Sequence, residues 1–421
     1  MTDRITERTL YPSIQRVFNE LGAKVISEVK YVSIPDFVVE WLGEHWIISI
    51  KIGDPNNPRE LKEAFMQYVS HMRDVGTEYG MIVFYPNEIK KRRTSADDVE
   101  DLVRNCSAYF IVLNPQLELR SSLPVALKKV EDVLSKRIPV SLSLETVVAL
   151  LKTQIEELME KIQIDEAQIM GIISDPKLFF GINPVEKDEV KRKEIVREAS
   201  KFLASYIFLS QVLFVRFYSE EKPSILRDLD LRKIQAEDVR EIFRRIKEIN
   251  YRPIFELDVI DFVKPELIQD TFNLLFSIQI KNIRFELPGR LFHELMPKKI
   301  RKLLAAFYTR PIAAYLLSLL TIEKPDVTVF DPACGSGTIL TMAYRKKLEL
   351  WREGKSANIN PHKIFCEEQI FGCDIMPFAV HLSNANLAAM DPLTTINSTQ
   401  IILGDALKLL PYEQMKPGFY D

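Results

Sequence analysis

The amino-acid sequence predicts a multidomain α/β protein with a helical region between two α/β regions. Residues 1–118 alternate helical and strand patterns, residues 119–285 have apolar residues at helical spacing almost throughout, and from residue 286 helix and strand alternate as in a parallel α/β layer. The chain has 421 residues, enough for two or three domains. We therefore expect a small α/β domain at 1–118, an all-helical connector at 119–285 and a second α/β domain at 286–421.

The first region begins with a helical pattern that runs from Arg8 to Gly22, and a second helical pattern occupies residues 59–76. Four apolar runs rich in β-branched and aromatic residues read as strands. They are DFVVEWL (36–42), HWIISIKI (45–52), GMIVFY (80–85) and YFIVLN (109–114). The first two are expected to form a hairpin with a two-residue turn at Gly43 and Glu44.

The middle region is predicted to be helical. Its clearest helices are LSLETVVALLKTQIEELMEKIQI (142–164) and EIVREASKFLASYIFLSQVLFVRFY (194–218). The second is apolar around most of its circumference, which is typical of a helix buried in a core.

Composition restricts the class of protein without identifying it. Apolar residues make up 47% of the chain and charged residues 27%, as in an ordinary globular protein, and the net charge of −3 neither implies nor excludes a polyanionic partner. The N-terminus MTDRITERTL is polar, which predicts no signal peptide, and no apolar run approaches the length of a membrane span. Four widely spaced cysteines indicate reduced thiols, so we expect a cytoplasmic protein without a membrane partner: Cys106, Cys334, Cys366 and Cys373.

The stretch VFDPACGSGTIL (329–340) has the pattern of a ligand-binding turn. A β-prone run ends at Asp331, Gly335 and Gly337 follow, and a helical pattern begins directly after them. Glycines permit backbone angles that a side chain forbids and let a ligand approach the main chain. A strand, a glycine turn and a helix N-terminus form a cradle for a nucleotide-like ligand. Neither the dinucleotide fingerprint Gly-x-Gly-x-x-Gly nor the lysine of a phosphate-binding loop is present.

Two further strands are expected to end in acids at the same edge. Asp374 closes the apolar run IFGCD, and Asp405 follows the run QIILG. An acid at the end of the second strand of such a layer is placed to accept hydrogen bonds from two ribose hydroxyls. Because the carboxyl ends of parallel strands share one edge, the three acids predict a single ligand crevice.

These motifs resemble those of a known family. DPACGSG (331–337) resembles the cofactor motif of DNA amino-methyltransferases, which use S-adenosyl-L-methionine, and residues 289–317 are similar to the segment before that motif in adenine-specific enzymes of the single-chain restriction–modification (type IIG-like) kind. The resemblance implies a Rossmann-like methyltransferase domain within 286–421. It also implies double-stranded DNA as the partner, with the target base pulled out of the duplex.

By this resemblance the cofactor site consists of named residues. Phe307, Tyr308 and Thr309 match a Phe-Tyr-Thr-Pro stretch that helps to bind the methionine part, although Arg310 stands in place of the family's proline. Asp374 would hold the ribose, Ile375 would pack on the adenine ring, and Asp405 would accept from the adenine amine. Four residues of the turn would line the methionine and the sugar: Asp331, Ala333, Gly335 and Gly337.

The loop that would carry out methyl transfer is missing from the sequence. The family uses an Asn/Asp/Ser-Pro-Pro-Tyr/Phe loop after the fourth strand, and these 421 residues contain no Pro-Pro dipeptide. The chain ends at KPGFYD, so we expect an incomplete, truncated or split methyltransferase that needs a second chain carrying the loop and the target-recognition region. Alone it should bind the cofactor weakly or not at all, and methylate nothing.

The hairpin of the first region resembles the core of PD-(D/E)xK nucleases. Asp36 matches the first acid and Lys51 the last residue of that motif, while Ser49 stands where the second carboxylate belongs. The resemblance implies a nuclease-like domain at 1–118 with Asp36 as a ligand for Mg²⁺, but one carboxylate and one hydroxyl make a poor magnesium site. Whether such a domain would cut DNA as an endonuclease stays open.

Three details belong to the same resemblance. The expected turn pairs Leu42 with His45 and so places Asp36 opposite Lys51. Glu7 matches an additional acid of many such nucleases, and Gln67-Tyr68 resembles a Gln-and-Tyr signature of restriction subunits. The alternative interpretation is a half-buried hairpin with an incidental Asp–Lys pair across the strands.

Two other functions remain open. Some RNA guanine methyltransferases carry a motif similar to DPACGSG, so the chain could be an RNA base amino-methyltransferase, although the Asp36–Lys51 hairpin favours DNA. The absence of a Pro-Pro loop also fits a non-catalytic remnant or a scaffold subunit.

Overall fold

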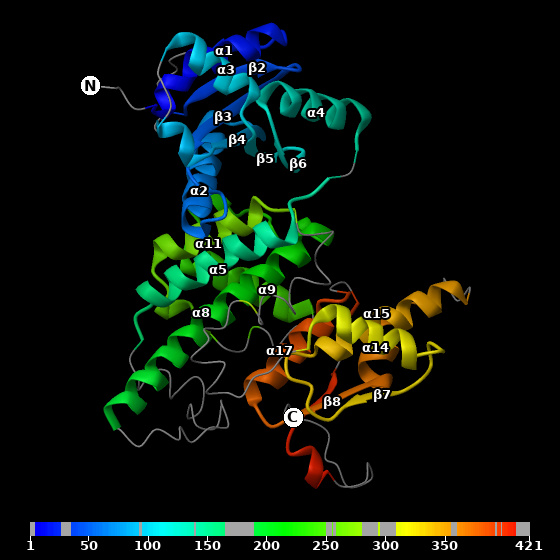
Figure 1. Ribbon diagram of the computed structural model, residues 1–421. Helices are drawn as coiled ribbons and strands as arrows, with labels where there is room; N and C mark the ends of the chain where they lie inside the picture. Colours follow the sequence, from blue (N-terminus) through cyan, green and yellow to red (C-terminus); the bar gives the residue numbers. More distant parts are fainter. Residues whose placement is uncertain are drawn as a thin grey trace. The chain divides into compact units, whose positions relative to one another are not determined.

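A computed structural model gives the fold of the chain (Figure 1). It describes residues 5–26, 35–91, 95–138, 140–164, 189–249, 255, 258–279, 294, 309–354, 360–391, 394–396 and 398–409. The chain divides into two compact units. The first comprises Met1–Thr153 with Phe276–Gln279, and the second comprises Gln154–Leu275 with Ile280–Asp421. The expected mixed α/β class is confirmed. The three-domain division stays a prediction.

The first unit is built on one six-stranded sheet with the order β1-β2-β3-β4-β5-β6. All neighbouring strands are antiparallel except β3 and β4, which are parallel. Parallel neighbours need a crossover connection, which α2 (Pro58–Val75) provides. The strands are β1 (Lys24–Ile26), β2 (Phe37–Trp41), β3 (Glu44–Ile52), β4 (Tyr79–Tyr85), β5 (Ala108–Leu113) and β6 (Gln116–Ser121).

Helices cover both faces of this sheet. Apolar residues of α1 (Glu7–Glu20), α3 (Ala96–Asn105) and α4 (Leu123–Lys136) join one core cluster with alternate residues of the strands. Because side chains alternate along a strand, the remaining strand residues face the opposite side of the sheet. Helix α2 packs on that side, and its Tyr68 lies against Gly80 of β4. A 3₁₀ turn, η1 (Asn87–Lys91), follows β4.

The turn between β2 and β3 lies one residue earlier than expected. Trp41 pairs with Glu44, so the two turn residues are Leu42 and Gly43. Their φ angles are 54° and 81°, and two positive φ values are the mark of a type I′ turn, whose twist matches that of the flanking strands. The predicted pairing of Leu42 with His45 is wrong.

This turn changes the position of the nuclease-like residues. Phe37 pairs with Ile48 in the observed register, and the same register extended by one residue places Asp36 opposite Ser49. The predicted position of Asp36 opposite Lys51 is therefore wrong by two residues. The physical reason is that a type I′ turn needs glycine most at its second position, which Gly43 occupies only if the turn begins at Leu42.

The helical part of the chain contains α5 (Leu144–Lys161), α8 (Glu189–Glu221), α9 (Ala236–Ile249) and α11 (Pro265–Phe276), with short 3₁₀ turns η2 (Pro223–Leu226), η3 (Leu231–Lys233) and η4 (Ile260–Phe262). The division between the two units falls within α5. Within α8, Arg197–Glu220 is long and apolar enough to cross a membrane, but 89% of its most apolar window is buried inside the protein. Such burial is what we expected of a core helix.

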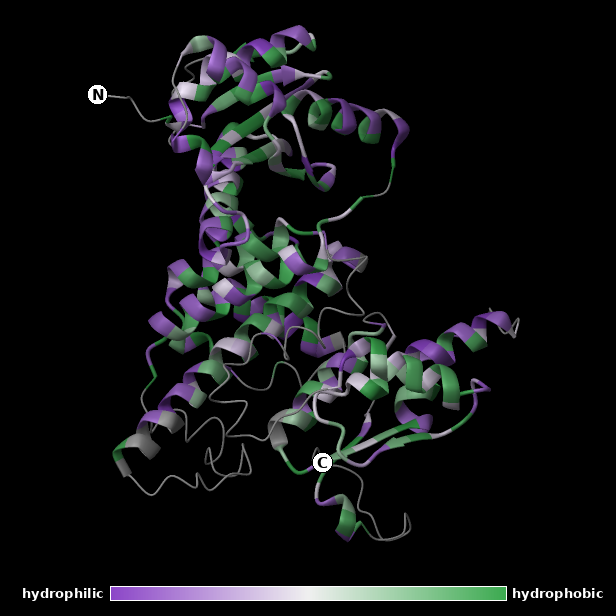
Figure 2. Cartoon of the chain, in the orientation of Figure 1, coloured by the Kyte–Doolittle hydropathy of each residue, from purple (hydrophilic) through white to green (hydrophobic). Residues whose placement is uncertain are grey.

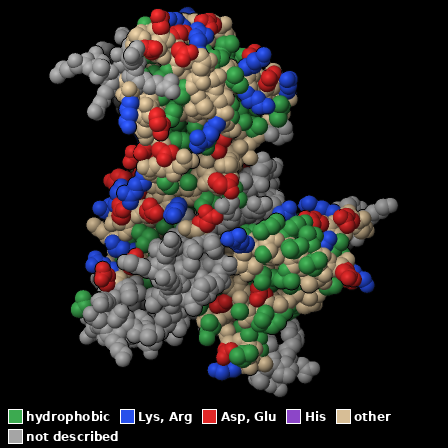
Figure 3. All heavy atoms as spheres, in the orientation of Figure 1, with side chains coloured by type: hydrophobic (Ala, Val, Ile, Leu, Met, Phe, Trp, Pro, Cys, Tyr) green, Lys and Arg blue, Asp and Glu red, His purple; other side chains and the backbone are tan. Residues whose placement is uncertain are grey.

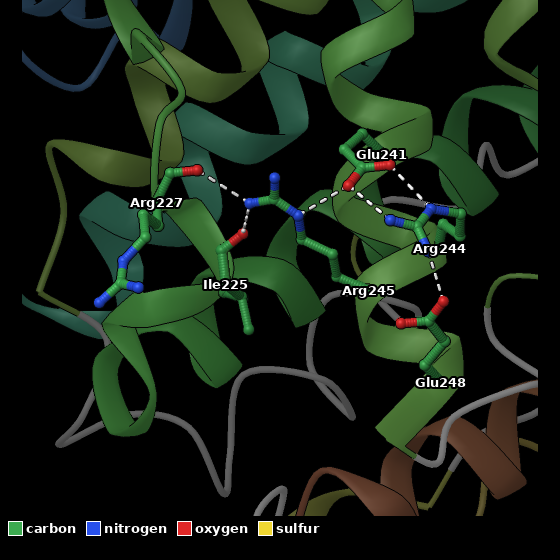
Figure 4. A network of polar contacts seen from close by, with 6 residues as sticks. All are labelled: Ile225, Arg227, Glu241, Arg244, Arg245 and Glu248. Atoms are coloured by element: carbon green, nitrogen blue, oxygen red, sulfur yellow. Dashed lines mark hydrogen bonds and ion pairs between the residues drawn. The ribbon is translucent and has the colours of Figure 1, made fainter.

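Helix α9 is fixed to the end of η2 by a polar network (Figure 4). Arg244 and Arg245 both donate to Glu241 at 2.8 Å. Arg245 also donates to the backbone carbonyl oxygens of Ile225 and Arg227, at 3.1 and 2.8 Å. The hydrogen bonds from the two arginines hold the pKa of Glu241 down to about 2. The network therefore orients α9 against the segment that contains η2.

The last part of the second unit is a three-stranded parallel sheet with the order β7-β8-β9. Its strands are β7 (Val329–Asp331), β8 (Ile370–Asp374) and β9 (Gln400–Leu403). The connections are α15 (Thr338–Glu353) and α17 (Pro377–Ala388), which contact each other and β8. A helix, α14 (Pro311–Thr321), precedes β7 and packs on α15. Short helices α16 (His362–Ile364) and η5 (Phe365–Gln369) lead into β8, and η6 (Ala406–Lys408) follows β9.

Candidate functional site

The predicted acids lie at the carboxyl edge of the parallel sheet. Asp331 is the last residue of β7, Asp374 is the last residue of β8, and Asp405 comes two residues after β9 ends. Asp331 pairs with Gly372, so each successive acid lies about two residues further along its strand. This edge, with the turn that follows β7, is the candidate cofactor edge.

The turn after β7 needs both of its glycines. Gly335 and Gly337 have φ angles of 54° and 76°, which side-chain-bearing residues rarely adopt. A Cβ on Gly337 would also lie 3.0 Å from the hydroxyl oxygen of Ser383 on α17. Within the turn, the N–H of Gly337 donates to the carbonyl of Cys334 at 2.8 Å, and α15 begins directly afterwards. The expected sequence of strand, glycine turn and helix is confirmed.

The carboxylate of Asp374 organises the turn. One oxygen accepts from the backbone N–H of Gly335 at 2.8 Å, and the other accepts from the N–H of Met376 at 2.9 Å. Each carboxylate oxygen has a second lone pair, so both can still accept from a ligand hydroxyl. The next residue, Ile375, is 65% exposed, although it is a large apolar side chain. An oriented acid beside an exposed apolar side chain fits a ligand with a ribose and an aromatic base.

The environment of Asp331 differs from that of Asp374. Burial raises the pKa of Asp331, the charge of Asp374 raises it further, and the hydrogen bond from the N–H of Ala333 (3.1 Å) opposes this shift. The two acids therefore interact electrostatically across the edge. Burial also raises the pKa of the Cys334 thiol to about 12, so this thiol is neutral near pH 7. All four cysteines are free, as expected for reduced thiols.

The remaining predicted cofactor residues have varied positions. Asp405 caps η6, because its carboxylate accepts from the N–H of Leu407 at 3.0 Å, and it forms an ion pair of 3.4 Å with Lys408. Thr309 is exposed just before α14. Phe307 and Tyr308 lie outside the described residues. Their roles in binding a cofactor stay predictions.

Two residues that hold the turn were not singled out from the sequence. Ser383 and Asn386 of α17 donate hydrogen bonds to the backbone carbonyls of Gly335 and Ser336, each at 2.7 Å. Both side chains are buried. The stretch FAVHLSNANLAAM (378–390) contains four polar residues among apolar ones, and two of them, Ser383 and Asn386, are three positions apart and so share a helix face.

In the first unit, the nuclease-like residues are held by local hydrogen bonds. The carboxylate of Asp36 accepts from the backbone N–H of Ile50 at 2.7 Å and from the hydroxyl of Tyr11. Lys51 donates to Gln67 of α2 at 2.8 Å, which brings together two residues of the predicted motif. In the same neighbourhood, burial lowers the pKa of His71 on α2, and the charges of Asp36 and Lys51 shift it in opposite directions.

Glu7 behaves in the same way as Asp36. Its carboxylate accepts from the backbone N–H of Ile52 at 3.2 Å. These two N–H groups of β3 lie beyond the end of β2, which begins only at Phe37. The two acids thus act as hydrogen-bond acceptors for two backbone N–H groups of β3 that lie beyond the observed pairing with β2.

These residues do not fit a magnesium ion. Mg²⁺ requires several hard oxygen ligands in octahedral geometry. Here Asp36 supplies one carboxylate, Ser49 is a buried hydroxyl, and no group of three or more His, Cys, Asp or Glu side chains that could hold a metal occurs among the residues that the structure describes. The described residues of the first unit therefore lack a ligand set suited to Mg²⁺.

Comparison with known proteins adds a second observation for the cofactor edge. Residues 293–416 match the family model described as N-6 DNA Methylase. The match includes the glycine turn and all three acids, and it supports a methyltransferase that uses S-adenosyl-L-methionine. It covers less than a third of the 421 residues. No curated protein matches the chain.

Several solved structures are remotely similar. The type IIG restriction endonuclease BpuSI is 14% identical, with a TM-score of 0.32 and a match over 97% of this chain and 43% of its own. DrdV, solved in complex with DNA, is 12% identical, with a TM-score of 0.33 and coverage of 94% and 40%. A modification subunit of a putative type I restriction enzyme from Vibrio vulnificus YJ016 is 16% identical, with a TM-score of 0.33 and coverage of 63% and 58%. The chain thus spans less than half the length of the first two proteins. With TM-scores below 0.5, the three similarities do not establish the fold or the activity of this chain.

Proposed function

We propose that the candidate cofactor edge binds S-adenosyl-L-methionine and that the chain is part of a DNA adenine methyltransferase of a restriction–modification system. The observation that carries the proposal is the hydrogen bond from Gly335 to Asp374, which joins the glycine turn to the acid of the neighbouring strand. The family match over residues 293–416 supports the same assignment.

In this proposal each residue has a distinct task. When bound, S-adenosyl-L-methionine supplies an electrophilic methyl group on its sulfonium centre. Asp374 accepts hydrogen bonds from the ribose hydroxyls, and Ile375 packs on the adenine ring. The turn from Asp331 to Gly337 lines the methionine and sugar with its backbone. Asp405 accepts a hydrogen bond from the adenine amine. Its carboxylate then either also keeps the ion pair with Lys408 or releases it.

Methyl transfer to DNA needs acceptors for the exocyclic amine of the target adenine, which becomes tetrahedral as it reacts. The sequence contains no Pro-Pro dipeptide, so we propose that a further segment or a second chain supplies the Asn-Pro-Pro-Tyr/Phe loop. Among the described residues, β7 and β9 each pair on one side only. An unpaired edge of this kind can receive an additional strand.

The surface of α14 supports the same proposal. Helix α14 is hydrophobic over most of its length, and hydrophobic side chains gather on the surface in its region (Figures 2 and 3). A contiguous apolar surface of this kind marks an interaction site more often than a free surface. Its exposed large residues are Ile312, Leu316, Leu317, Leu319 and Leu320.

Isothermal titration calorimetry of the full chain with S-adenosyl-L-methionine and with its demethylated product tests the cofactor assignment. We expect weak but measurable binding, and about 10- to 100-fold weaker binding for Asp374→Asn, which removes the charge from the proposed hydrogen bonds to the ribose. Asp326→Asn is the matched control, because Asp326 is exposed and lies before the amino end of β7, whereas the proposed site lies at the carboxyl ends of the strands. Equal affinity in the wild type and Asp374→Asn, or equal binding of NAD, would contradict the proposal.

A further inference from the structure

The glycine turn is held from two opposite sides. On one side the N–H of Gly335 donates to Asp374, and on the other the carbonyl of the same residue accepts from the hydroxyl of Ser383 at 2.7 Å. The next carbonyl, that of Ser336, accepts from the side-chain amide of Asn386 at 2.7 Å. Two consecutive carbonyls are thus matched by two donors three residues apart, which lie on one face of α17.

Both donors are buried. Ser383 is fully buried and Asn386 is 6% exposed, so water cannot replace either donor readily. Helix α17 can approach this closely only because Gly337 lacks a side chain: a Cβ there would lie 3.0 Å from the Ser383 hydroxyl oxygen. The turn also contains two positive φ angles, a backbone shape that persists where surrounding contacts determine it.

Helix α17 and Asp374 form one continuous segment. Asp374 closes β8, and α17 begins at Pro377, three residues later. The same segment therefore carries the acid that receives the turn's N–H and the two side chains that donate to its carbonyls. Displacing the turn relative to α17 would displace Gly335 relative to Asp374 as well.

We propose that Ser383 and Asn386 are positioning residues for the cofactor: they fix the glycine turn against Asp374 without touching the bound molecule. The inference rests on the proposed function, because it assigns these residues to the same cofactor site. Removing either donor loosens the turn and lowers the affinity for S-adenosyl-L-methionine, by about tenfold for each donor removed.

The chain offers a matched control on the same helix. Asn384 is also buried, but its side chain accepts a hydrogen bond from the hydroxyl of Thr399, before β9, and not from the turn. Asn384→Ala and Asn386→Ala remove the same group at neighbouring positions. If Asn386 were merely structural, the two variants would change affinity equally for a given loss of thermal stability.

The experiment measures two quantities in the full chain: the affinity for S-adenosyl-L-methionine by calorimetry, and hydrogen–deuterium exchange of residues 331–341 without any ligand. Ser383→Ala and Asn386→Ala should each weaken binding about tenfold and speed exchange in this segment, whereas Asn384→Ala should change neither. If the wild type binds and both variants bind equally well, this inference is overturned and the proposed function stands. If the wild type shows no binding at millimolar ligand, either alone or together with the segment or second chain that completes the domain, the proposed function fails, and the inference fails with it.

Discussion

The carboxylate of Asp36 accepts a hydrogen bond from the backbone N–H of Ile50 at 2.7 Å. This contact satisfies an N–H of β3 beyond the observed pairing with β2, and we therefore propose that Asp36 stabilises the fold. Asp36→Ala should lower the free energy of unfolding of the first unit by about 1–3 kcal/mol, because a half-buried N–H loses its acceptor. Thermal unfolding and amide exchange of residues 46–54 measure the effect.

Asp36→Asn separates this role from metal binding. The amide oxygen of Asn can still accept from Ile50, so most of the stability should remain, whereas a metal ligand would lose its function in both variants. We expect no Mg²⁺-dependent nicking of plasmid DNA by the wild type and no change in either variant. Nicking by the wild type that Asp36→Asn and Lys51→Ala abolish would restore the nuclease interpretation.

The hairpin also marks the limit of prediction from the sequence. The apolar alternation identified both strands. Moving the turn by one residue leaves the same side chains facing the core on each strand, but it shifts the cross-strand pairing by two residues and so changes the residue opposite Asp36. The sequence pattern therefore predicted the strands correctly and could not fix which polar residues meet across them.

Leu42 occupies a position of the turn that suits it poorly. Its φ angle is 54°, its side chain is 44% exposed, and a residue with a Cβ pays about 1 kcal/mol or more for this conformation. Leu42→Asn would create the Asn-Gly pair that type I′ turns favour, so we expect a gain of about 0.5–1 kcal/mol in stability. Leu21→Asn is the control: Leu21 is 40% exposed, but its φ is −89°. Chemical denaturation that gives both variants the same change would contradict the turn assignment.

The candidate cofactor edge was more predictable than the hairpin. Asp331, Gly335 and Gly337 follow one another along the chain, so their spacing alone places them at the end of a strand and in a turn. Parallel connectivity then brings Asp374 to the same edge. The contact of Ser383 with the glycine turn was not predictable in this way. The two are 48 residues apart, and their contact depends on how α17 packs on the sheet.

Gly337 should tolerate no side chain. Ala at this position would adopt a φ of 76° and bring its Cβ within 3.0 Å of the Ser383 hydroxyl, so we expect a loss of at least about 1–2 kcal/mol and of binding to S-adenosyl-L-methionine. Gly354→Ala is the control at the end of α15, where φ is −75° and the nearest contact of a Cβ would be an ordinary 3.5 Å. Thermal unfolding of both variants, with and without the cofactor, decides the point. A stable Gly337→Ala variant that binds normally would refute the described turn.

The part of the second unit that contains the parallel sheet should lose stability as the pH falls below about 6.5. His362 is fully buried, and its Nδ1 lies 2.9 Å from the Tyr344 hydroxyl. Burial lowers its pKa from 6.5 to about 4, although the charge of Asp391 opposes the shift. Between these two values the unfolded chain binds a proton that the folded chain does not, so stability falls as pH falls from about 6.5 to about 4, by at most about 3 kcal/mol from this group. Burial lowers the pKa of His381 to about 4 as well, which adds to the loss in the same window.

His362→Asn tests the contribution of His362 alone. Asn keeps a polar atom near the position of Nδ1 but does not titrate, so the variant should lose less stability than the wild type between pH 7 and pH 5, and the His381 part of the loss should remain. Unfolding midpoints at both pH values give the comparison, and His45→Asn, at an exposed position next to the β2–β3 turn, is the matched control. If the unfolding midpoints of the wild type and His362→Asn fall equally between pH 7 and pH 5, protonation of His362 does not destabilise the fold. That outcome would contradict the burial of His362 against Tyr344.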